Sequence, residues 1–425
     1  MPAKTTRVDY LIIGAGMSGT VLRRFLRSDS VVLLDPNPES YKIGESIIPT
    51  HFSHPVLRAL IPAVRKLPSY SQKWGTTFVT DAAVASFPLE PQAAEGAVHV
   101  AREELEALMR AEWKTPVVRE RVTEVDLARK RVVTDRSVYQ VEKQILDCSG
   151  PAMVVASAAQ DIVPIRPVFS RWTYFDVTSL DDSRFWTSVL DGGRDYRRFE
   201  PASGRLLEGA ETGGWAPSKT TILTAVSEGL WTWQIPMYKA NVLSFGVVSR
   251  HGPVSDEQLH DLAERTHAAQ YTLRRRRAVP GSALHATHRR DGFARRARVP
   301  ATLDYVLVAD ACAFADPIYS VGTGLAVNKA IELAETLNDG GWTPAKRDKY
   351  CADYEALLKR AVSAFEYWYT GALLKDDAAA AEVQRDYLYG NAFAPGVAKH
   401  YGDAVNDSES REYDGDGLPK GAPRY

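Results

Sequence analysis

The strongest constraint on the fold lies at the start of the chain, where a strand, a glycine-rich turn, a helix and a second strand follow one another. The apolar run Val8–Ile13 is typical of a buried parallel strand, and Gly14-Ala15-Gly16-Met17-Ser18-Gly19 comes directly after it. A second run, Val31–Leu34, ends at Asp35, about 20 residues beyond the turn, where an acid commonly binds the ribose hydroxyls of a nucleotide. This order predicts an α/β fold with a Rossmann-like nucleotide site, the alternative being a purely structural glycine turn.

Each glycine of this turn has its own physical reason. Gly14 permits the tight turn, Gly16 lets the backbone approach a pyrophosphate, and Gly19 allows the helix to pack closely on the strand. The first N–H groups of the helix have no partner within it, so they can bind an anion. The cofactor-binding residues predicted from this unit are Gly14, Gly16, Ser18, Gly19 and Asp35.

A later unit favours FAD over NAD. Tyr305–Val308 has the pattern of a buried strand and is followed by Asp310, and the turn Gly322-Thr323-Gly324 then opens an apolar helix that runs to Leu337. A second strand, acid, turn and helix in one chain indicate contacts with the ribityl and pyrophosphate groups of a flavin, so Asp310 and Gly322 are predicted to bind FAD. Arg102, at the start of a predicted helix, is a further candidate, and its alternative reading is a solvated charge.

Composition excludes several classes of partner. The 425 residues are 45% hydrophobic and 25% charged, which is typical of a globular chain long enough for two joined domains. Lysine plus arginine number 52 against 53 acidic residues, so no overall field favours nucleic acid or an anionic membrane. With no signal-peptide pattern, no membrane-length apolar run and three scattered cysteines, we expect a cytoplasmic protein with reduced thiols. His285 and His288 lack a third ligand, so no metal site is predicted.

Four further motifs occur together with the nucleotide unit. They are Gly44-Glu45-Ser46-Ile47-Ile48-Pro49, Lys73 before Trp-Gly, Trp231-Thr232-Trp233-Gln234-Ile235-Pro236, and Asp316-Pro317-Ile318-Tyr319-Ser320-Val321-Gly322. In this order they resemble the motifs of flavin-dependent halogenases, which are built on the FAD fold of para-hydroxybenzoate hydroxylase. The resemblance covers about residues 8 to 370.

The resemblance implies an enzyme that uses reduced FAD, O2 and chloride or bromide to make hypohalous acid, with a separate flavin reductase as partner. Lys73 matches the lysine that guides this oxidant to an electron-rich aromatic substrate; its alternative reading is a surface lysine before a strand. The other residues to which the resemblance gives roles are Gly44, Glu45, Ser46 and Arg102 at the flavin, Val321 and Gly322 at the halide, and Trp231, Trp233, Tyr319 and Ser320 at the substrate pocket. Glu45 and Ser46 are expected to act as turn residues through their backbone, and the tryptophan pair has a domain interface as its alternative.

One departure bears on the substrate. Halogenases of free tryptophan carry a glutamate where this chain has Tyr319, so the resemblance points to phenols, pyrroles or carrier-protein-bound acyl groups instead. Two other readings stay open. A flavin monooxygenase of the same fold would hydroxylate an aromatic ring, including one on a protein substrate, without halide. A flavin-binding protein that only transfers electrons would leave Lys73 and the indoles without a purpose.

The expected organisation is a discontinuous FAD-binding domain, an antiparallel-sheet substrate domain, a helical C-terminal region and a loose tail. Their predicted limits are residues 1–165 with 301–340, 166–300, 341–401 and 402–425. Within the substrate domain, turn-rich stretches at 191–198 and 202–219 are expected to form an irregular insertion or a lid. The basic run Arg274–Arg277 is expected on a solvated helix face, with docking of an acidic partner as its alternative.

Overall fold

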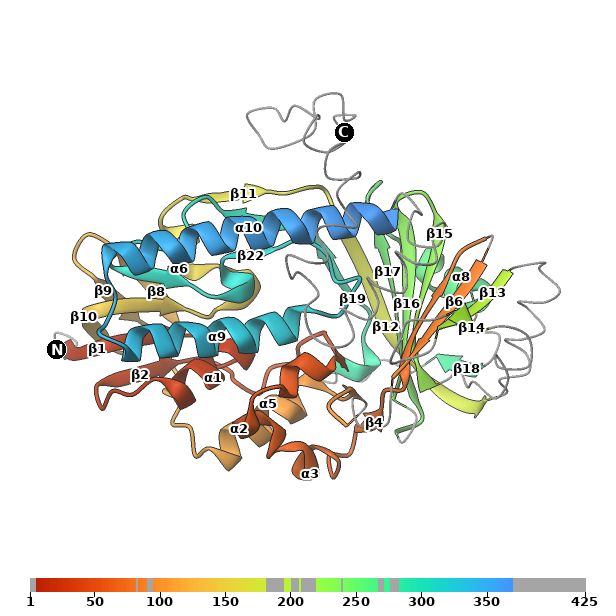
Figure 1. Cartoon of the computed structure of the whole chain (residues 1–425), viewed down its shortest axis with the longest axis horizontal. Helices are drawn as coiled ribbons and strands as arrows, with labels where there is room; N and C mark the ends of the chain where they lie inside the picture. Colours follow the sequence, from red (N-terminus) through yellow and green to blue (C-terminus); the bar gives the residue numbers. More distant parts are fainter. Residues whose placement is uncertain are drawn as a thin grey trace.

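The computed structural model describes residues 5–81, 83–89, 95–180, 195–199, 206–207, 219–237, 240–266, 271–275 and 283–369. Two large sheets dominate this part of the chain. One lies beside the long helices, and the other lies at the opposite end of the molecule (Figure 1). The class is mixed α/β, as predicted. The predicted tail at 402–425 and the end of the helical region after residue 369 lie outside the described residues.

The first sheet has six strands. Four of them run parallel to one another, and the other two extend the sheet by antiparallel pairing. They are β2 (Val31–Leu34), β1 (Thr5–Ile13), β10 (Val138–Asp147) and β21 (Tyr305–Leu307), followed by the antiparallel β9 (Arg131–Thr134) and β8 (Val122–Asp126). Ile13 is paired with both Leu34 and Asp147, and Asp147 is paired with Leu307. The parallel strands therefore end at one edge, and the loops that follow them meet there.

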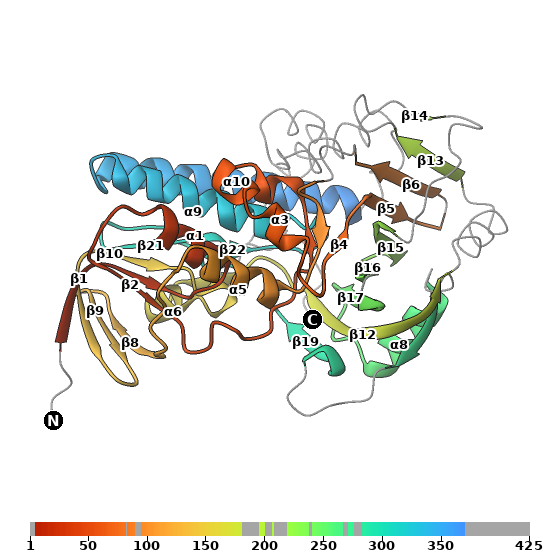
Figure 2. The same cartoon turned by 90° about the horizontal axis from the view of Figure 1, so that it is seen from below.

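Four helices position these loops. They are α1 (Met17–Phe25), α5 (Arg102–Glu112), α9 (Gly322–Asn338) and α10 (Pro344–Tyr369). The last two run side by side along the six-stranded sheet in both views (Figures 1 and 2). Asn338 joins the ends of α9 and α1, because its side chain accepts from the Arg27 N–H at 2.8 Å and donates to the Phe25 carbonyl at 2.9 Å. The helices predicted after Gly19 and from Leu325 to Leu337 are confirmed.

The second sheet has ten strands and carries the tryptophan motif near its middle. In order they are β14 (Leu206–Leu207), β13 (Asp195–Phe199), β6 (Ala83–Pro88), β5 (Gly75–Val79), β15 (Thr221–Ser227), β16 (Leu230–Met237), β17 (Val242–Ser249), β12 (Phe169–Leu180) and β18 (Tyr271–Arg275), with β19 (His288–Asp291) also on β12. Helix α8 (Asp256–Arg265) packs on β12 and β17, and the sheet stands at the far end from β1 (Figure 2).

This sheet differs from the predicted antiparallel one in two respects. It takes in β5 and β6 from well before residue 166, and it is mixed, because β5 pairs parallel with β15 and β6 pairs parallel with β13. The physical reason is that all of β5 and β6 is buried, so the backbone groups on both edges of this hairpin need strand partners. The expected helix at Arg274 is also wrong, since Arg274 lies in β18, paired with Asp176 of β12.

Small elements connect the two sheets. A three-stranded sheet holds β3 (Ser46–Ile47), β7 (Val98–His99) and β4 (Ser71–Gln72), and another holds β11 (Ile162–Pro164), β20 (Arg295–Ala297) and β22 (Ala313–Phe314). The short helices are η1 (Pro49–Phe52), α2 (Pro55–Arg58), α3 (Ile61–Val64), η2 (Gly150–Ala152), α6 (Val154–Ala158), η7 (Ala283–His285) and η8 (Ala309–Ala311). No helix in the described ranges is long and apolar enough to cross a membrane.

Candidate functional site

The glycine turn after β1 has the geometry that the sequence predicts. Gly14 has φ +98°, and a Cβ there would lie 2.5 Å from the Cys148 carbonyl oxygen. A Cβ on Gly19 would lie 1.8 Å from the Gly14 carbonyl, so the helix could not pack as closely on the strand. At Gly16, by contrast, the nearest protein atom would be 3.8 Å away. Packing within the protein therefore explains two of the glycines, whereas at the third a Cβ would make only ordinary van der Waals contacts, with Glu106 and Lys42.

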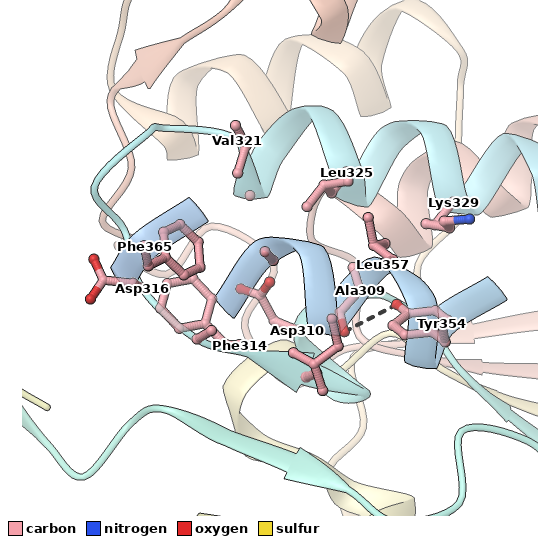
Figure 3. A pocket seen from close by; sticks show the side chains of 15 residues that line it. Ala309, Asp310, Phe314, Asp316, Val321, Leu325, Lys329, Tyr354, Leu357 and Phe365 are labelled. Atoms are coloured by element: carbon pink, nitrogen blue, oxygen red, sulfur yellow. Dashed lines mark hydrogen bonds between the residues drawn. The ribbon is translucent and has the colours of Figure 1, made fainter. Parts of the chain in front are cut away.

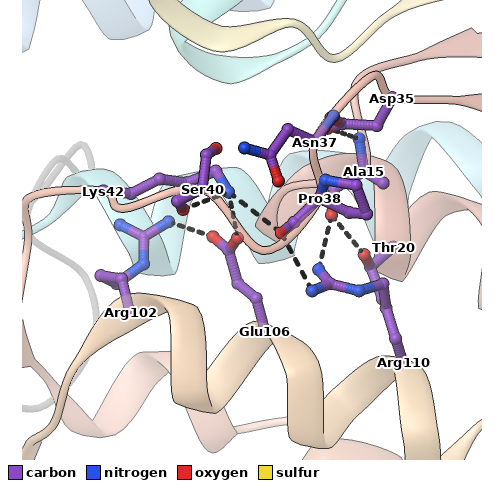
Figure 4. Close-up of polar contacts among 10 residues, drawn as sticks. All are labelled: Ala15, Thr20, Asp35, Asn37, Pro38, Ser40, Lys42, Arg102, Glu106 and Arg110. Atoms are coloured by element: carbon purple, nitrogen blue, oxygen red, sulfur yellow. Dashed lines mark hydrogen bonds and ion pairs between the residues drawn. The ribbon is translucent and has the colours of Figure 1, made fainter. Parts of the chain in front are cut away.

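Asp35 supports this turn from the end of β2. Its carboxylate accepts the Ala15 N–H at 2.8 Å and the Asn37 N–H at 2.8 Å (Figure 4). Ser18, in the first turn of α1, is buried beside Cys148. The structure thus brings together all five residues that the strand and turn pattern selects.

A charged cluster on α5 lies under the turn (Figure 4). Glu106 is fully buried and forms ion pairs with Lys42 at 3.0 Å and with Arg102 at 2.7 Å. Arg110 donates to the carbonyls of Ala15 and Pro38 at 2.9 and 3.0 Å. Sequence reasoning missed Lys42, Glu106 and Arg110, although the spacing of four residues along α5 places 102, 106 and 110 on one helix face. Because Glu106 faces two cations, these ion pairs keep one excess positive charge.

Arg102 connects three of the predicted segments. Gly44 has φ +119°, and a Cβ there would lie 2.9 Å from an Arg102 Nη atom, so the turn backbone rests on the guanidinium. Burial raises the pKa of Asp310 to about 6, against the opposing charges of Arg102 and Arg290. With its side chain 14% exposed, Arg102 is not the solvated charge of the alternative reading.

Lys73 is buried at the junction of the three-stranded sheet that holds β4 and the ten-stranded sheet that holds β5. It follows β4 and precedes β5, and its side chain is 1% exposed. Its Nζ donates to Ser46 Oγ at 2.9 Å, and burial lowers the pKa of the ammonium to about 7. The reading of Lys73 as a surface lysine is therefore wrong.

The turn that contains Glu45 and Ser46 acts through its side chains as well as its backbone. Glu45 is buried and accepts a hydrogen bond from the Tyr174 hydroxyl, which itself lies 2.6 Å from the hydroxyl of Tyr41. The Trp172 indole N–H donates to Tyr41 at 2.7 Å. The expectation that Glu45 and Ser46 act only through their backbone is therefore wrong. Both side chains are buried and form hydrogen bonds with other protein groups.

The tryptophan motif lies on β16, with both indoles in a buried cluster. Trp231 donates to the Tyr369 hydroxyl at 2.8 Å, and that hydroxyl donates to Asp316 at 2.8 Å. Trp233 covers Gly246 of β17, where a Cβ would be only 2.1 Å from the indole ring. The indole centroids are 6.1 Å apart. Trp231 is thus linked to the Asp316 segment by hydrogen bonds, while Trp233 has the close packing expected of a structural residue.

The segment between Asp316 and α9 is held in a strained turn. Asp316 accepts the Ile318 N–H at 3.1 Å, and burial raises the pKa of Asp316 to about 6. Ser320 has φ +56°, an uncommon backbone conformation for a residue with a side chain. Tyr319 stacks on Phe365 of α10 with the ring centroids 5.7 Å apart. Tyr319 is therefore packed against α10.

The start of α9 meets the segment that follows Pro49. Val321 is the N-cap, and a Cβ on Gly324 would be 2.8 Å from Thr50 Oγ1. Burial, with the charge of Arg102, lowers the pKa of the neighbouring His51 to about 3, so its ring is neutral. The free N–H groups of the first helical turn have the polarity that binds anions.

An apolar pocket adjoins this region (Figure 3). Asp310, Asp316, Val321 and Gly322 line one side of it, and α10 lines the other with Tyr354, Leu357 and Phe365. Neither Lys73 nor the tryptophan pair lines this pocket. In the described ranges no group of histidine, cysteine and acidic side chains has the arrangement of a metal site.

Comparison with known proteins shows a shared fold and a family match over part of the chain. Residues 204–379 match the family model for tryptophan halogenase. A search of curated proteins finds no match. Among solved structures, the flavin-dependent brominase Bmp2 has a TM-score of 0.69 at 15% identity, covering 95% of this chain and 100% of that one. Halogenase PltM has a TM-score of 0.66 at 13% identity, covering 95% and 92%. A flavoprotein/dehydrogenase from Cytophaga hutchinsonii has a TM-score of 0.68 at 18% identity, covering 95% and 100%.

Proposed function

We propose that this chain belongs to the flavin-dependent halogenase family and is an FAD-dependent enzyme that halogenates an electron-rich aromatic substrate. The single observation that carries the proposal is the buried Lys73, whose ammonium group has a pKa of about 7 and one hydrogen-bond partner, Ser46. An amine is costly to bury, and a group with so perturbed a pKa in a flavoprotein fold is a strong candidate for chemistry.

The residues around the glycine turn fit FAD. The Gly16 backbone, which carries no Cβ, and the first N–H groups of α1 would receive the pyrophosphate, whose charge the excess positive charge near Glu106 would balance. Asp35 would bind the ribose. Arg102, Asp310 and Gly322 would hold the flavin end, with Gly44, Glu45 and Ser46 contributing their backbone. When bound and reduced by a separate flavin reductase, FAD would supply the O2 activation that oxidises chloride or bromide to hypohalous acid.

The protein would then steer this oxidant. The start of α9, at Val321 and Gly322, offers N–H groups for a halide ion. Lys73 would act in one of two ways. As an ammonium, it would hydrogen-bond hypohalous acid; as a neutral amine, it would form an N–halo bond with loss of water and pass the halogen to the ring, taking a proton back. With a pKa of about 7, both forms are present near neutral pH.

The substrate class follows from Tyr319 and the indoles. Tyr319, Ser320, Trp231 and Trp233 would form the substrate side of the site, with an aromatic ring where a tryptophan halogenase has a glutamate. A phenol, a pyrrole or a carrier-protein-bound acyl group suits such a wall better than the amino group of free tryptophan.

The test is mass spectrometry of products formed from phenols, pyrroles and indoles with FAD, a flavin reductase, NADH and air. Reactions run with bromide or without halide. A bromine isotope pair that disappears in Lys73→Met and persists in the control Lys66→Met, an exposed lysine, supports the proposal. Gain of one oxygen without halide would instead support an aromatic monooxygenase. Bromination by Lys73→Met at the wild-type rate would refute the role of Lys73.

A further inference from the structure

Lys73 is the first member of a row of buried side chains. Its Nζ is 2.9 Å from Ser46 Oγ, Ser46 Oγ is 3.0 Å from Thr221 Oγ1, and Thr221 Oγ1 is 2.9 Å from His99 Nε2. The other ring nitrogen of His99 lies 2.9 Å from the Pro236 carbonyl oxygen. Each side chain in the row is at most 4% exposed.

Five separate segments build this row. Ser46 of β3 is paired with His99 of β7 in the three-stranded sheet, and Lys73 directly follows β4, the third strand of that sheet. Thr221 begins β15 and Pro236 belongs to β16, so both come from the ten-stranded sheet. The row therefore crosses from one sheet to the other, and its partners are far apart in the sequence.

The chemistry of the two ends fixes the direction of every hydrogen bond. A carbonyl oxygen only accepts, so His99 Nδ1 carries the proton and donates to Pro236. Burial, together with the charge of Lys73, lowers the pKa of His99 to about 3, so the ring is neutral and Nε2 accepts. Thr221 then donates to His99 and Ser46 donates to Thr221, which leaves Ser46 Oγ to accept from Lys73.

We infer that Ser46, Thr221 and His99 are positioning residues that hold the Lys73 amino group by one hydrogen bond and leave its remaining valences directed at the oxidant. This inference rests on the proposed function only for the identity of the oxidant. Within the described residues Ser46 is the only hydrogen-bond partner of Nζ. A bound molecule therefore meets two N–H groups of the ammonium, or one N–H group and the lone pair of the neutral amine.

Positioning explains the row better than proton transfer does. A proton that left Lys73 along the row would end on His99, whose pKa is about 3, and the Pro236 carbonyl beyond it cannot take up a proton. The row therefore cannot carry a proton away from Lys73, and its role is to orient the Lys73 amino group. Each donor also polarises the next, so Ser46 becomes a better acceptor for the charged ammonium.

This polarisation has a measurable consequence. A hydrogen bond to the charged form of a group favours that form, so the hydrogen bond that Ser46 accepts opposes the lowering of the Lys73 pKa by burial. The ionisable group of the described residues that senses the charge of Lys73 is His99 on β7, and it stays neutral above about pH 3. Breaking the row should therefore shift the titration of Lys73 to lower pH without involving another charge.

The variants to compare are Thr221→Val, which removes the hydroxyl, and Thr221→Ser, which keeps it. Thr224→Val is the matched control, because Thr224 is a buried threonine of the same strand whose hydroxyl has no partner. Acetylation of Lys73 by acetic anhydride is followed by peptide mass spectrometry against pH, with exposed Lys66 as the internal reference, in full-length protein loaded with oxidised FAD.

Thr221→Val is expected to move the midpoint for Lys73 to lower pH by about half a unit or more, while Thr221→Ser and Thr224→Val keep the wild-type midpoint. Bromination should fall about tenfold in kcat in Thr221→Val, with KM for the aromatic substrate little changed. If Thr221→Val does not retain FAD, Ser46→Ala removes the direct partner and should shift the midpoint likewise. An unchanged midpoint in these variants would overturn the inference even if the protein halogenates. A shifted midpoint in a protein that does not halogenate would instead leave the inference standing and refute the proposed function.

Discussion

Replacing Lys73 by Met should raise the free energy of unfolding while abolishing halogenation. The wild-type protein buries an ammonium group whose pKa falls from 10.5 to about 7 on folding. At neutral pH folding therefore has to release a proton or bury a charge, and both are unfavourable. Methionine has a similar length and carries no charge, so this cost disappears.

The magnitude follows from the difference between the two pKa values. At pH 7 the shift in pKa corresponds to about 4 kcal/mol against folding of the wild-type protein. Lys73→Met removes this cost but also loses the hydrogen bond to Ser46, which reduces the gain in stability by about 1 kcal/mol. The unfolded state binds more protons than the folded state between about pH 7 and 10.5. Wild-type stability therefore rises with pH in this window, and the cost falls to about 2 kcal/mol at pH 9.

The assay is urea unfolding followed by tryptophan fluorescence at pH 7 and pH 9, with the same excess of FAD. Lys73→Met should exceed wild type by about 3 kcal/mol at pH 7 and by about 1 kcal/mol at pH 9. Lys66→Met, at an exposed site, should show no such pH dependence. An equal difference at both pH values would refute the reasoning, since it would mean that Lys73 titrates alike in the folded and unfolded states.

Three further outcomes follow from packing and charge. Gly16→Ala should unfold like wild type, because the protein atoms nearest to the added Cβ lie at an ordinary contact distance of 3.8 Å. The same Cβ should keep the pyrophosphate away from the backbone and weaken FAD binding about tenfold, measured by flavin fluorescence; wild-type affinity would contradict this. Gly246→Ala should lower the free energy of unfolding by about 2 kcal/mol, since its Cβ would lie 2.1 Å from the Trp233 ring, and a second change, Trp233→Phe, should recover part of the loss. Glu106→Gln should cost about 2 to 4 kcal/mol in urea unfolding because two cations lose their buried partner, whereas Glu142→Gln, from an exposed pair, should cost under about 0.5 kcal/mol.

The elements that could be predicted are those with a local signal. The strand ending at Ile13, the glycine turn and the helix after it depend on contacts between residues that are close in sequence, so periodicity and glycine placement are sufficient. The same holds for α9. Lys73 also precedes a strand, β5, as the motif predicts.

What escaped prediction depends on contacts between distant parts of the chain. The parallel pairing of β5 with β15 has no local signal, because each strand is equally apolar wherever it pairs. The hydrogen bonds of Lys73 with Ser46, and of Thr221 with His99, join separate strands for the same reason. Glu106 looked like an ordinary helix-surface acid, since only the folded turn at Lys42 buries it.

The mixed pairing of the large sheet also affects the order in which the chain can fold during synthesis. The β5–β6 hairpin leaves the ribosome before its neighbour β15, which emerges roughly 140 residues later, or on the order of ten seconds at common elongation rates. During that interval a hairpin that is fully buried in the folded protein has unpaired edges, which is the situation that invites aggregation and chaperone binding. A fragment that ends between β6 and β15 would carry this hairpin without its partner β15 permanently. We therefore do not expect such a fragment to be soluble when it is expressed alone.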